Sequence, residues 1–125
     1  MSYIQILTVL KSKMFNFIFY ILIMELDKIK EREIMPGFHG KIVNGDNITW
    51  AFWRIDEGAE LPEHKHVHEQ IMHVIDGKIK FTFDGKPLIY GPGSIVVIPS
   101  NMPHSGVALT QCKIMDVFTP VREDL

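Results

Sequence analysis

The sequence predicts an all-β fold, a sandwich or barrel of short strands. Turn signals recur closely after Met24, and the runs between them have strand length. These runs are rich in Val, Ile, Phe and Trp, which strands prefer. No stretch has a convincing long helical pattern, and only Lys28 to Glu33 is compatible with a short helix. Frequent turns combined with few helices are typical of all-β sandwiches and barrels.

The first 23 residues differ from the rest of the chain. Lys11 and Lys13 precede a mostly apolar run from Met14 to Ile23. This run is shorter than the roughly 20 residues that span a bilayer, and no small-residue cleavage site follows it. We therefore expect residues 1–23 to be a hydrophobic N-terminal extension outside the functional domain of residues 24–125. A membrane-surface anchor and an extra strand in a dimer are the alternatives.

At least five strands are expected in the remaining sequence. Asp-Gly, Gly-Pro-Gly and Pro-Ser-Asn turns separate several of them, because these residues adopt turn conformations readily. No internal repeat or linker follows Met24, so one domain is expected. The predicted strands are Ile48 to Ile55, Gln70 to Ile75, Lys78 to Phe83, Ile95 to Ile98 and Cys112 to Phe118.

Composition and charge exclude several classes of protein. Hydrophobic residues make up 46% of the chain and charged residues 22%, as in an ordinary globular protein. The formal net charge of -2 gives no reason to expect nucleic acid, which selects basic surfaces, and no membrane partner is expected. Cys112 is the single cysteine, so no intrachain disulfide forms. That fits a reducing compartment, and we expect a cytoplasmic location.

A cluster of histidines predicts a metal site. Residues two apart in an extended chain share one face, so we expect His64, His66, His68 and Gln70 to point the same way. Imidazole is a common ligand of transition metals. His104 follows a later turn and can close the site from a neighbouring strand. We expect one divalent transition metal, with zinc, nickel, manganese and iron as candidates; surface histidines in a dimer contact are the alternative.

Two spacing patterns around these histidines resemble the motifs of the cupin family. The first cupin motif is Gly, five residues, H-x-H, three or four residues, Glu, six residues, Gly. The second is Gly, five residues, Pro-x-Gly, two residues, His, three residues, Asn. Asn101 and Ala108 depart from the second motif. The resemblance implies a double-stranded β-helix, or jelly-roll barrel, that binds a metal. The matching residues are Gly58, His64, His66, Gln70, Gly77, Gly93, Pro99 and His104.

Gln70 is a chemical departure from the many cupins that have glutamate at this position. Glu69 is adjacent, but its parity directs it away from the histidine face. The amide oxygen of Gln70 is therefore the expected fourth ligand. Three imidazoles and an amide are all neutral, so the ion keeps its full charge and is a stronger electrophile. In the alternatives, Gln70 only lines the pocket while water binds the metal, or a bulge near Glu69 reverses the parity.

The C-terminal stretch adds two charged groups. Ile114, Asp116 and Phe118 share one strand face with Cys112, and a carboxylate on an inward face is costly unless it is paired or functional. Arg122 follows this strand and can fold back over the barrel mouth, where its guanidinium is suited to bind a carboxylate. The alternative is an ion pair between Asp116 and Arg122 that closes the C-terminus.

The ending Asp-Val-Phe-x-Pro-x-Arg-x-Asp, together with H-x-H-x-H-E-Q, resembles one subgroup of single-domain cupins, the pectin-degradation protein KdgF and its relatives. That group is described as converting 4,5-unsaturated uronates, released by pectin or alginate lyases, to ring-opened keto sugars. The resemblance implies a metal-dependent enzyme of carbohydrate metabolism that acts on an anionic sugar. Small cupins often dimerise, so a homodimer is also expected. The implied site comprises the metal ligands His64, His66, Gln70 and His104, and the catalytic residues Asp116, Phe118 and Arg122.

Alternative functions and residues remain open at this stage. An iron-dependent dioxygenase, a non-catalytic small-molecule-binding cupin, and a cyclase or isomerase are the rival functions. We expect His68 to lie near the site without binding the metal, His73 to pack elsewhere, and Trp53 to fill the barrel. His39 is expected in a loop, and Arg54 is a candidate for the pocket wall.

Overall fold

A computed structural model describes residues 7–14 and 17–125. Contacts divide the chain into two units, Met1–Glu31 and Arg32–Leu125. The first unit contains an antiparallel hairpin of β1 (Thr8–Met14) and β2 (Phe17–Ile23), followed by the 3-10 turn η1 (Leu26–Lys28). Lys28 to Glu33, whose sequence is compatible with a short helix, forms none beyond Lys28. That stretch has one strongly apolar residue, Ile29, and so lacks the apolar stripe that packs a helix against a core.

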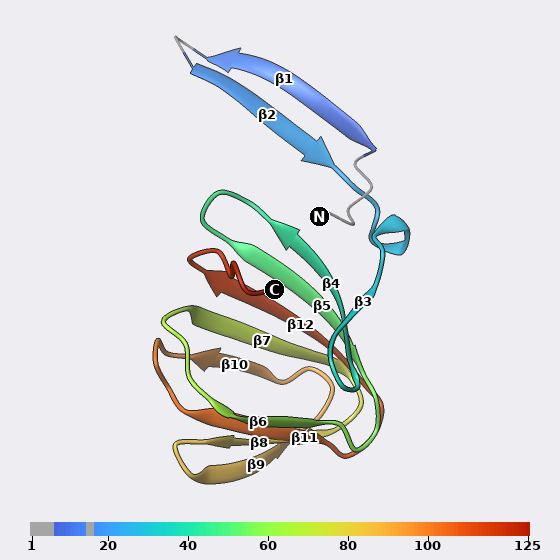
Figure 1. The fold of residues 1–125 in the computed structure, drawn as a ribbon, viewed down its shortest axis with the longest axis vertical. Helices are drawn as coiled ribbons and strands as arrows, with labels where there is room; N and C mark the ends of the chain where they lie inside the picture. Colours follow the sequence, from blue (N-terminus) through green and yellow to red (C-terminus); the bar gives the residue numbers. More distant parts are fainter. Residues whose placement is uncertain (1–6, 15–16) are drawn as a thin grey trace. The chain divides into compact units, whose positions relative to one another are not determined.

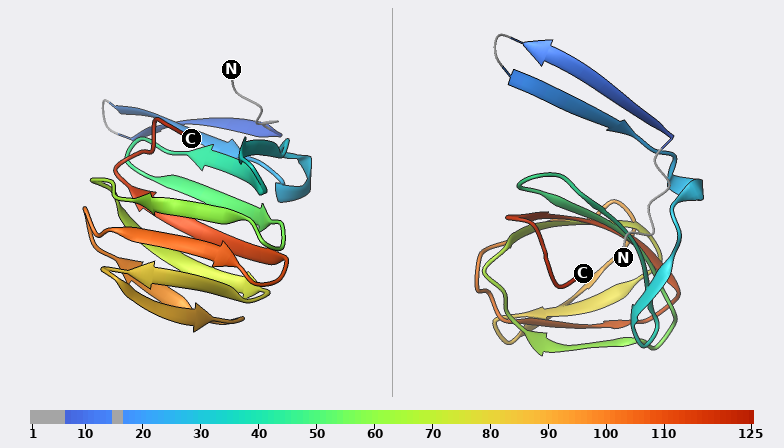
Figure 2. Two further views of the ribbon diagram at one scale, coloured as in Figure 1. Left: turned by 60° about the horizontal axis from the view of Figure 1, so that its bottom comes forward. Right: turned by 45° about the horizontal axis from the view of Figure 1, so that its top comes forward.

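The second unit is built from two antiparallel sheets that together form a barrel, as predicted (Figures 1 and 2). The six-stranded sheet has the order β10-β7-β12-β5-β4-β3, and the four-stranded sheet has the order β6-β11-β8-β9. The first sheet consists of β3 (Arg32–Met35), β4 (Phe38–Asn44), β5 (Thr49–Ile55), β7 (Glu69–Asp76), β10 (Ile95–Ile98) and β12 (Cys112–Thr119). The second consists of β6 (Glu60–His64), β8 (Ile79–Phe83), β9 (Lys86–Tyr90) and β11 (His104–Ala108).

The barrel interior follows from two-residue periodicity on the central strands. On β5 and on β12, every second residue is buried, because alternate side chains point to opposite faces of a sheet. Since β12 lies between β5 and β7, its inward face is covered by neighbours on both sides. The predicted inward face of β12 is therefore confirmed, and it places a carboxylate inside the barrel. Its buried residues are Cys112, Ile114, Asp116 and Phe118.

Two turns position the strands that carry the site. Gly77 has a φ of 84°, and a Cβ there would lie 2.2 Å from the Gln111 carbonyl oxygen, so only glycine fits this turn. Asn101 has a φ of 62°, a conformation that asparagine tolerates better than most residues. Its N–H donates a hydrogen bond of 2.7 Å to the His66 carbonyl oxygen. The turn before β11 is thereby bound to the loop between β6 and β7.

Two residues lie elsewhere than expected. His39 is on β4 and not in a loop, and its Nε2 is 3.0 Å from an Asp56 carboxylate oxygen. Arg54 is not on the cavity wall; it lies on the outward face of β5 and pairs with the same carboxylate. Within residues 7–14 and 17–125, no helix is long and apolar enough to cross a membrane.

Candidate functional site

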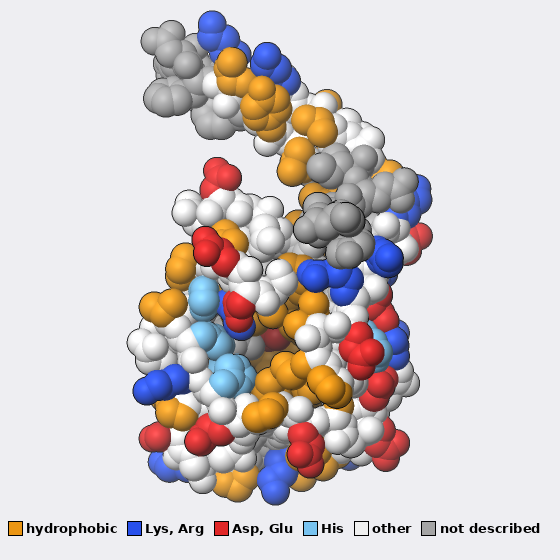
Figure 3. Space-filling model, in the orientation of Figure 1, with side chains coloured by type: hydrophobic (Ala, Val, Ile, Leu, Met, Phe, Trp, Pro, Cys, Tyr) orange, Lys and Arg blue, Asp and Glu red, His pale blue; other side chains and the backbone are white. Residues whose placement is uncertain are grey.

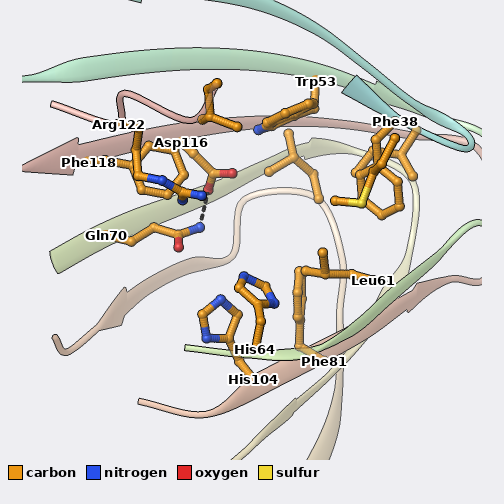
Figure 4. A pocket seen from close by; sticks show the side chains of 14 residues that line it. Phe38, Trp53, Leu61, His64, Gln70, Phe81, His104, Asp116, Phe118 and Arg122 are labelled. Atoms are coloured by element: carbon orange, nitrogen blue, oxygen red, sulfur yellow. Dashed lines mark hydrogen bonds between the residues drawn. The ribbon is translucent and has the colours of Figure 1, made fainter. Parts of the chain in front are cut away.

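Three imidazoles converge inside the barrel at the edge of the four-stranded sheet. His64 ends β6, His104 begins β11, and the two are cross-strand partners. His66 reaches them from the loop that follows β6. One ring nitrogen from each histidine lies within 4.8 Å of the others, so small shifts of the rings would let one ion bind all three at about 2.1 Å. Figure 4 shows His64 and His104 side by side in the cavity.

Backbone carbonyl groups orient each of these rings. The Nδ1 atoms of His64, His66 and His104 lie 3.0, 2.9 and 2.7 Å from the carbonyl oxygens of Pro62, His68 and Met102, respectively. A carbonyl oxygen only accepts hydrogen bonds, so each Nδ1 carries the proton and each Nε2 keeps its lone pair. Metal-binding histidines typically have this arrangement, because the second nitrogen fixes the tautomer and the ring orientation.

Burial keeps two of the rings in the metal-binding protonation state. Burial is the main cause that lowers the pKa of His66 to about 4, and the nearby charges of Arg122 and His104 act in the same direction. Burial also lowers the pKa of His104. Both imidazoles are therefore neutral at neutral pH, and only a neutral imidazole binds a metal.

Gln70 faces the histidines from β7 on the opposite sheet. Its Nε2 donates a hydrogen bond of 2.9 Å to Asp116 Oδ1, which leaves Oε1 as the free end of the amide (Figure 4). Among the described residues, three side-chain atoms are buried without a hydrogen-bond partner: Oε1 of Gln70, Nε2 of His66 and Nδ1 of His68. Such orphaned polar atoms are rare and costly. Three imidazole nitrogens and this amide oxygen therefore fit a divalent transition metal.

The parity argument for this cluster is correct at one end only. Gln70 is buried and Glu69 is exposed, as predicted. His64 and Gln70 do not, however, belong to one continuous strand, since β6 ends at His64 and β7 begins at Glu69. The loop between them, held by Asn101 N–H, turns His66 into the cluster instead.

Asp116 is buried on β12, next to Gln70. Gln70 lies opposite Phe118 in the β7–β12 register, so Gln70 and Asp116 are diagonal neighbours on one face. Burial raises the pKa of Asp116 to about 7, against the opposing effect of hydrogen bonds from Gln70 and Trp53 and of the Arg122 charge. Near neutral pH this carboxyl can therefore both hold and release a proton.

Arg122 folds back over the mouth of the barrel, as predicted. Its N–H donates a 2.8 Å hydrogen bond to Thr49 Oγ1, and its guanidinium carbon lies 4.7 Å from the centre of the Phe118 ring. The alternative ion pair with Asp116 is not formed. Instead, Arg122 Nε and Nη2 donate to the two carboxylate oxygens of Asp124 at 2.8 and 2.7 Å.

Most of these groups, His66 and Asp124 excepted, line one cavity of about 70 Å³. It is larger than the roughly 10–15 Å³ that one water requires. Figure 3 shows histidine side chains gathered beside a hollow with apolar side chains around it. The polar end of the cavity comprises His64, Gln70, His104, Asp116 and Arg122. The apolar remainder comprises Met35, Phe38, Trp53, Ile55, Leu61, Phe81, Ile114, Phe118 and Leu125.

Sequence reasoning missed two contributors. Trp53, expected to fill the barrel, lines the cavity, and its indole lowers the pKa of Asp116. Asp124 was not considered, although the Arg-x-Asp spacing at the end of the chain signals a local pair. His68 lies outside the cavity and contacts the C-terminal segment, with Nε2 3.2 Å from the Val121 carbonyl oxygen.

Comparison with known proteins agrees with this geometry. The model of the cupin domain family matches residues 51–118. A comparison with curated protein sequences gives no match. Among solved structures, KdgF from Halomonas sp. is 28% identical over 80% of this chain and 94% of its own, with a TM-score of 0.75.

Two further structures show the fold alone. An RmlC-like cupin from Shewanella frigidimarina is 24% identical over 91% of this chain and 96% of its own, with a TM-score of 0.76. Salicylate 1,2-dioxygenase from Pseudaminobacter salicylatoxidans is 21% identical over 67% of this chain and 26% of its own, with a TM-score of 0.64. The chain therefore belongs to the cupin domain family, as a single-domain cupin that resembles KdgF.

Proposed function

We propose that this cupin is a metal-dependent enzyme that converts 4,5-unsaturated uronates, the products of pectin or alginate lyases, to linear keto sugars. One observation carries the proposal. Two histidines of the metal-binding cluster, His64 and His104, line the same cavity as a buried carboxyl group and a buried guanidinium. Such a set can bind an anionic sugar and transfer a proton to it. The similarity to KdgF supports the choice of substrate.

Each group of the site has a different role in this reaction. His64, His66, His104 and the Gln70 oxygen would hold the ion, which when bound would supply Lewis-acid polarisation of a substrate oxygen. Arg122 binds the sugar carboxylate, since a guanidinium matches a carboxylate bidentately. Phe118 packs against the sugar ring and, through its contact with the guanidinium, keeps Arg122 beside it.

Asp116 transfers the proton. The C4=C5 double bond of the substrate carries the ring oxygen on C5, so it is an enol ether. Hydration adds a proton at C4 and a water oxygen at C5. The bond between C5 and the ring oxygen then breaks, and the ring oxygen takes a proton, which leaves a ketone at C5 in an open chain. Asp116 donates the first proton and accepts one from the attacking water, and Gln70 holds its carboxyl in place.

The test follows the loss of the conjugated C=C absorbance of unsaturated galacturonate. We expect turnover by the metal-loaded protein and none after chelation. Asp116→Asn should lose about 10²–10⁴-fold in rate while it retains the metal. Asp76→Asn, which changes an exposed aspartate at the end of β7, is the matched control and should keep parental activity.

Three outcomes would count against the proposal. Parental turnover by Asp116→Asn would remove Asp116 from the mechanism. Oxygen consumption with a candidate substrate, combined with no loss of uronate absorbance, would favour the dioxygenase alternative. Binding of the uronate without turnover would favour a non-catalytic binding module.

A further inference from the structure

Asp124 binds one particular edge of the Arg122 guanidinium. A guanidinium has five N–H donors and offers a carboxylate two bidentate edges, one formed by Nε and Nη2 and one by the two Nη atoms. Asp124 occupies the first edge with two short hydrogen bonds, 2.8 Å to Nε and 2.7 Å to Nη2. Three N–H groups remain, two on Nη1 and one on Nη2, so the terminal edge is intact.

The two partners lie on different sides of the barrel mouth. The Arg122 side chain is 10% exposed, whereas the Asp124 side chain is 62% exposed. Arg122 lines the cavity together with Gln70 and Asp116, and Asp124 does not. Asp124 thus holds the guanidinium from the solvent side. In Figure 4 the guanidinium points to the same part of the cavity as Asp116 and Gln70.

The backbone of this segment is anchored separately from the side chain. Arg122 N–H bonds to Thr49 Oγ1 at 2.8 Å, and the Val121 carbonyl oxygen is 3.2 Å from His68 Nε2. These contacts fix the backbone at Arg122 but leave the side-chain torsion angles free. Phe118 stacks on the guanidinium without setting the direction of its donors. Within the described residues, Asp124 supplies the only hydrogen bonds to the guanidinium.

We propose that Asp124 is a positioning residue that directs the terminal edge of Arg122 into the cavity, ready for the carboxylate of the ligand. The inference rests on the proposed function, because it takes Arg122 as the group that binds the substrate carboxylate. A long, flexible side chain that is ordered beforehand loses less conformational entropy when the ligand binds. Asp124 therefore acts on substrate affinity and leaves the chemical step unchanged.

A competing role for Asp124 predicts the opposite change in KM. If Asp124 instead occupied Arg122 in place of the substrate, its removal would free the guanidinium and lower KM. Steady-state kinetics of Asp124→Asn therefore separate positioning from competition. Glu123→Gln is the matched control, since Glu123 is an exposed neighbour that makes no hydrogen bond to the guanidinium in the described part of the chain.

The experiment uses the full-length, metal-loaded protein. For Asp124→Asn we expect KM for unsaturated galacturonate to rise about 2- to 10-fold, the range for the ordering of one long side chain, with kcat unchanged. Asp124→Glu keeps a carboxylate on a longer arm and should restore part of the affinity. An unchanged or lower KM in Asp124→Asn overturns the inference. A fall in kcat by the same factor as the expected rise in KM also overturns it, because the chemical step would then be affected.

Binding of a saturated sugar separates this inference from the proposed function. Galacturonate and the neutral sugar galactose are titrated into each variant by calorimetry. We expect the parent to prefer galacturonate, and Asp124→Asn to lose part of that preference while its affinity for galactose stays constant. This result without parental turnover overturns the proposed function alone. A parent with turnover but no effect of Asp124→Asn on KM or on galacturonate affinity overturns the inference alone. A parent that does not prefer galacturonate overturns the inference as well.

Discussion

The two walls of the cavity are held in place by different means. On the wall formed by β6, β11 and the loop after β6, backbone carbonyl oxygens orient all three histidines. On the wall formed by β7, β12 and the C-terminal segment, side chains hold one another. There, Gln70 bonds to Asp116 and Asp124 bonds to Arg122.

The difference has a physical consequence for mutation. A carbonyl oxygen is supplied by the backbone whatever the side chain, so substitutions around the histidine wall leave ring orientation intact. The opposite wall depends on pairs, and removal of one partner leaves the other unsatisfied or misdirected. We therefore expect changes in the first wall to act on metal binding, and changes in the second to act on turnover and substrate affinity.

The largest expected effect is loss of the metal from the histidine wall. His104→Ala removes a buried ligand that lies opposite His64, and we expect divalent-metal affinity to fall by more than about 10²-fold, beyond the range for residues around a metal site. Turnover should fall with it. Metal content after gel filtration, measured by mass spectrometry, and activity on the same samples check this.

A histidine outside the cavity provides the matched control. His73 also lies on a strand of the barrel, β7, but has the opposite parity to Gln70. His73→Ala should retain metal and activity. Full metal content in His104→Ala would contradict the assignment of the histidine wall.

Gln70 faces the histidines and also bonds to Asp116, so its substitution separates an effect on metal binding from an effect on turnover. Gln70→Glu keeps an oxygen for the ion but removes the N–H that bonds to Asp116 Oδ1 at 2.9 Å. Two adjacent carboxyl groups then share a proton, because like charges at this distance do not both ionise readily. We expect the metal to be retained and kcat to fall about 10- to 10²-fold, within the usual range for groups around a metal centre. Loss of the metal in this variant would show that Gln70 acts on metal binding, like the three histidines.

A smaller effect is expected on the stability of the metal-free protein. Burial raises the pKa of Asp116 from 3.8 to about 7, so between these pH values the folded state binds more protons than the unfolded state. The contribution of this carboxyl to the free energy of unfolding is therefore full below pH 4 and is lost as pH rises towards 7. Asp116→Asn does not titrate, so relative to the parent it should become more stable with rising pH.

Between low pH and pH 8, the free energy of unfolding of Asp116→Asn relative to the parent should rise by at most about 4 kcal/mol, since one pKa unit corresponds to about 1.4 kcal/mol. Urea unfolding of chelated parent and Asp116→Asn at pH 4.5 and pH 8 measures it, and titration of the other groups cancels in the comparison. A difference that is constant with pH would contradict the raised pKa.

Much of this architecture follows from local sequence patterns. All five predicted strands are present with ends within one residue of those expected, because their two-residue periodicity and their turns are local properties. The burial of Asp116 follows from the same periodicity. Two strands that were not predicted, β4 and β11, contain glycine and polar residues. Their pairing depends on neighbours distant in sequence, as in the packing of Gly106 against the Phe81 ring.

The finer structure of the site depends on contacts that spacing does not encode. The position of His66 follows from a loop fixed by Asn101 N–H, a residue from another hairpin. The partner of Arg122 is Asp124 and not Asp116 because of the direction that the chain takes after β12. The carbonyl contacts of the three histidines arise from backbone geometry, which the identity of the side chains does not specify.

The central claim is that three imidazoles and one amide oxygen bind a single divalent ion. Anomalous diffraction from crystals of the metal-loaded protein tests it most directly. We predict one peak per chain, about 2.0–2.2 Å from Nε2 of His64, His66 and His104 and from Oε1 of Gln70. An ion bound through Nδ1, or a peak away from these four atoms, would contradict the claim.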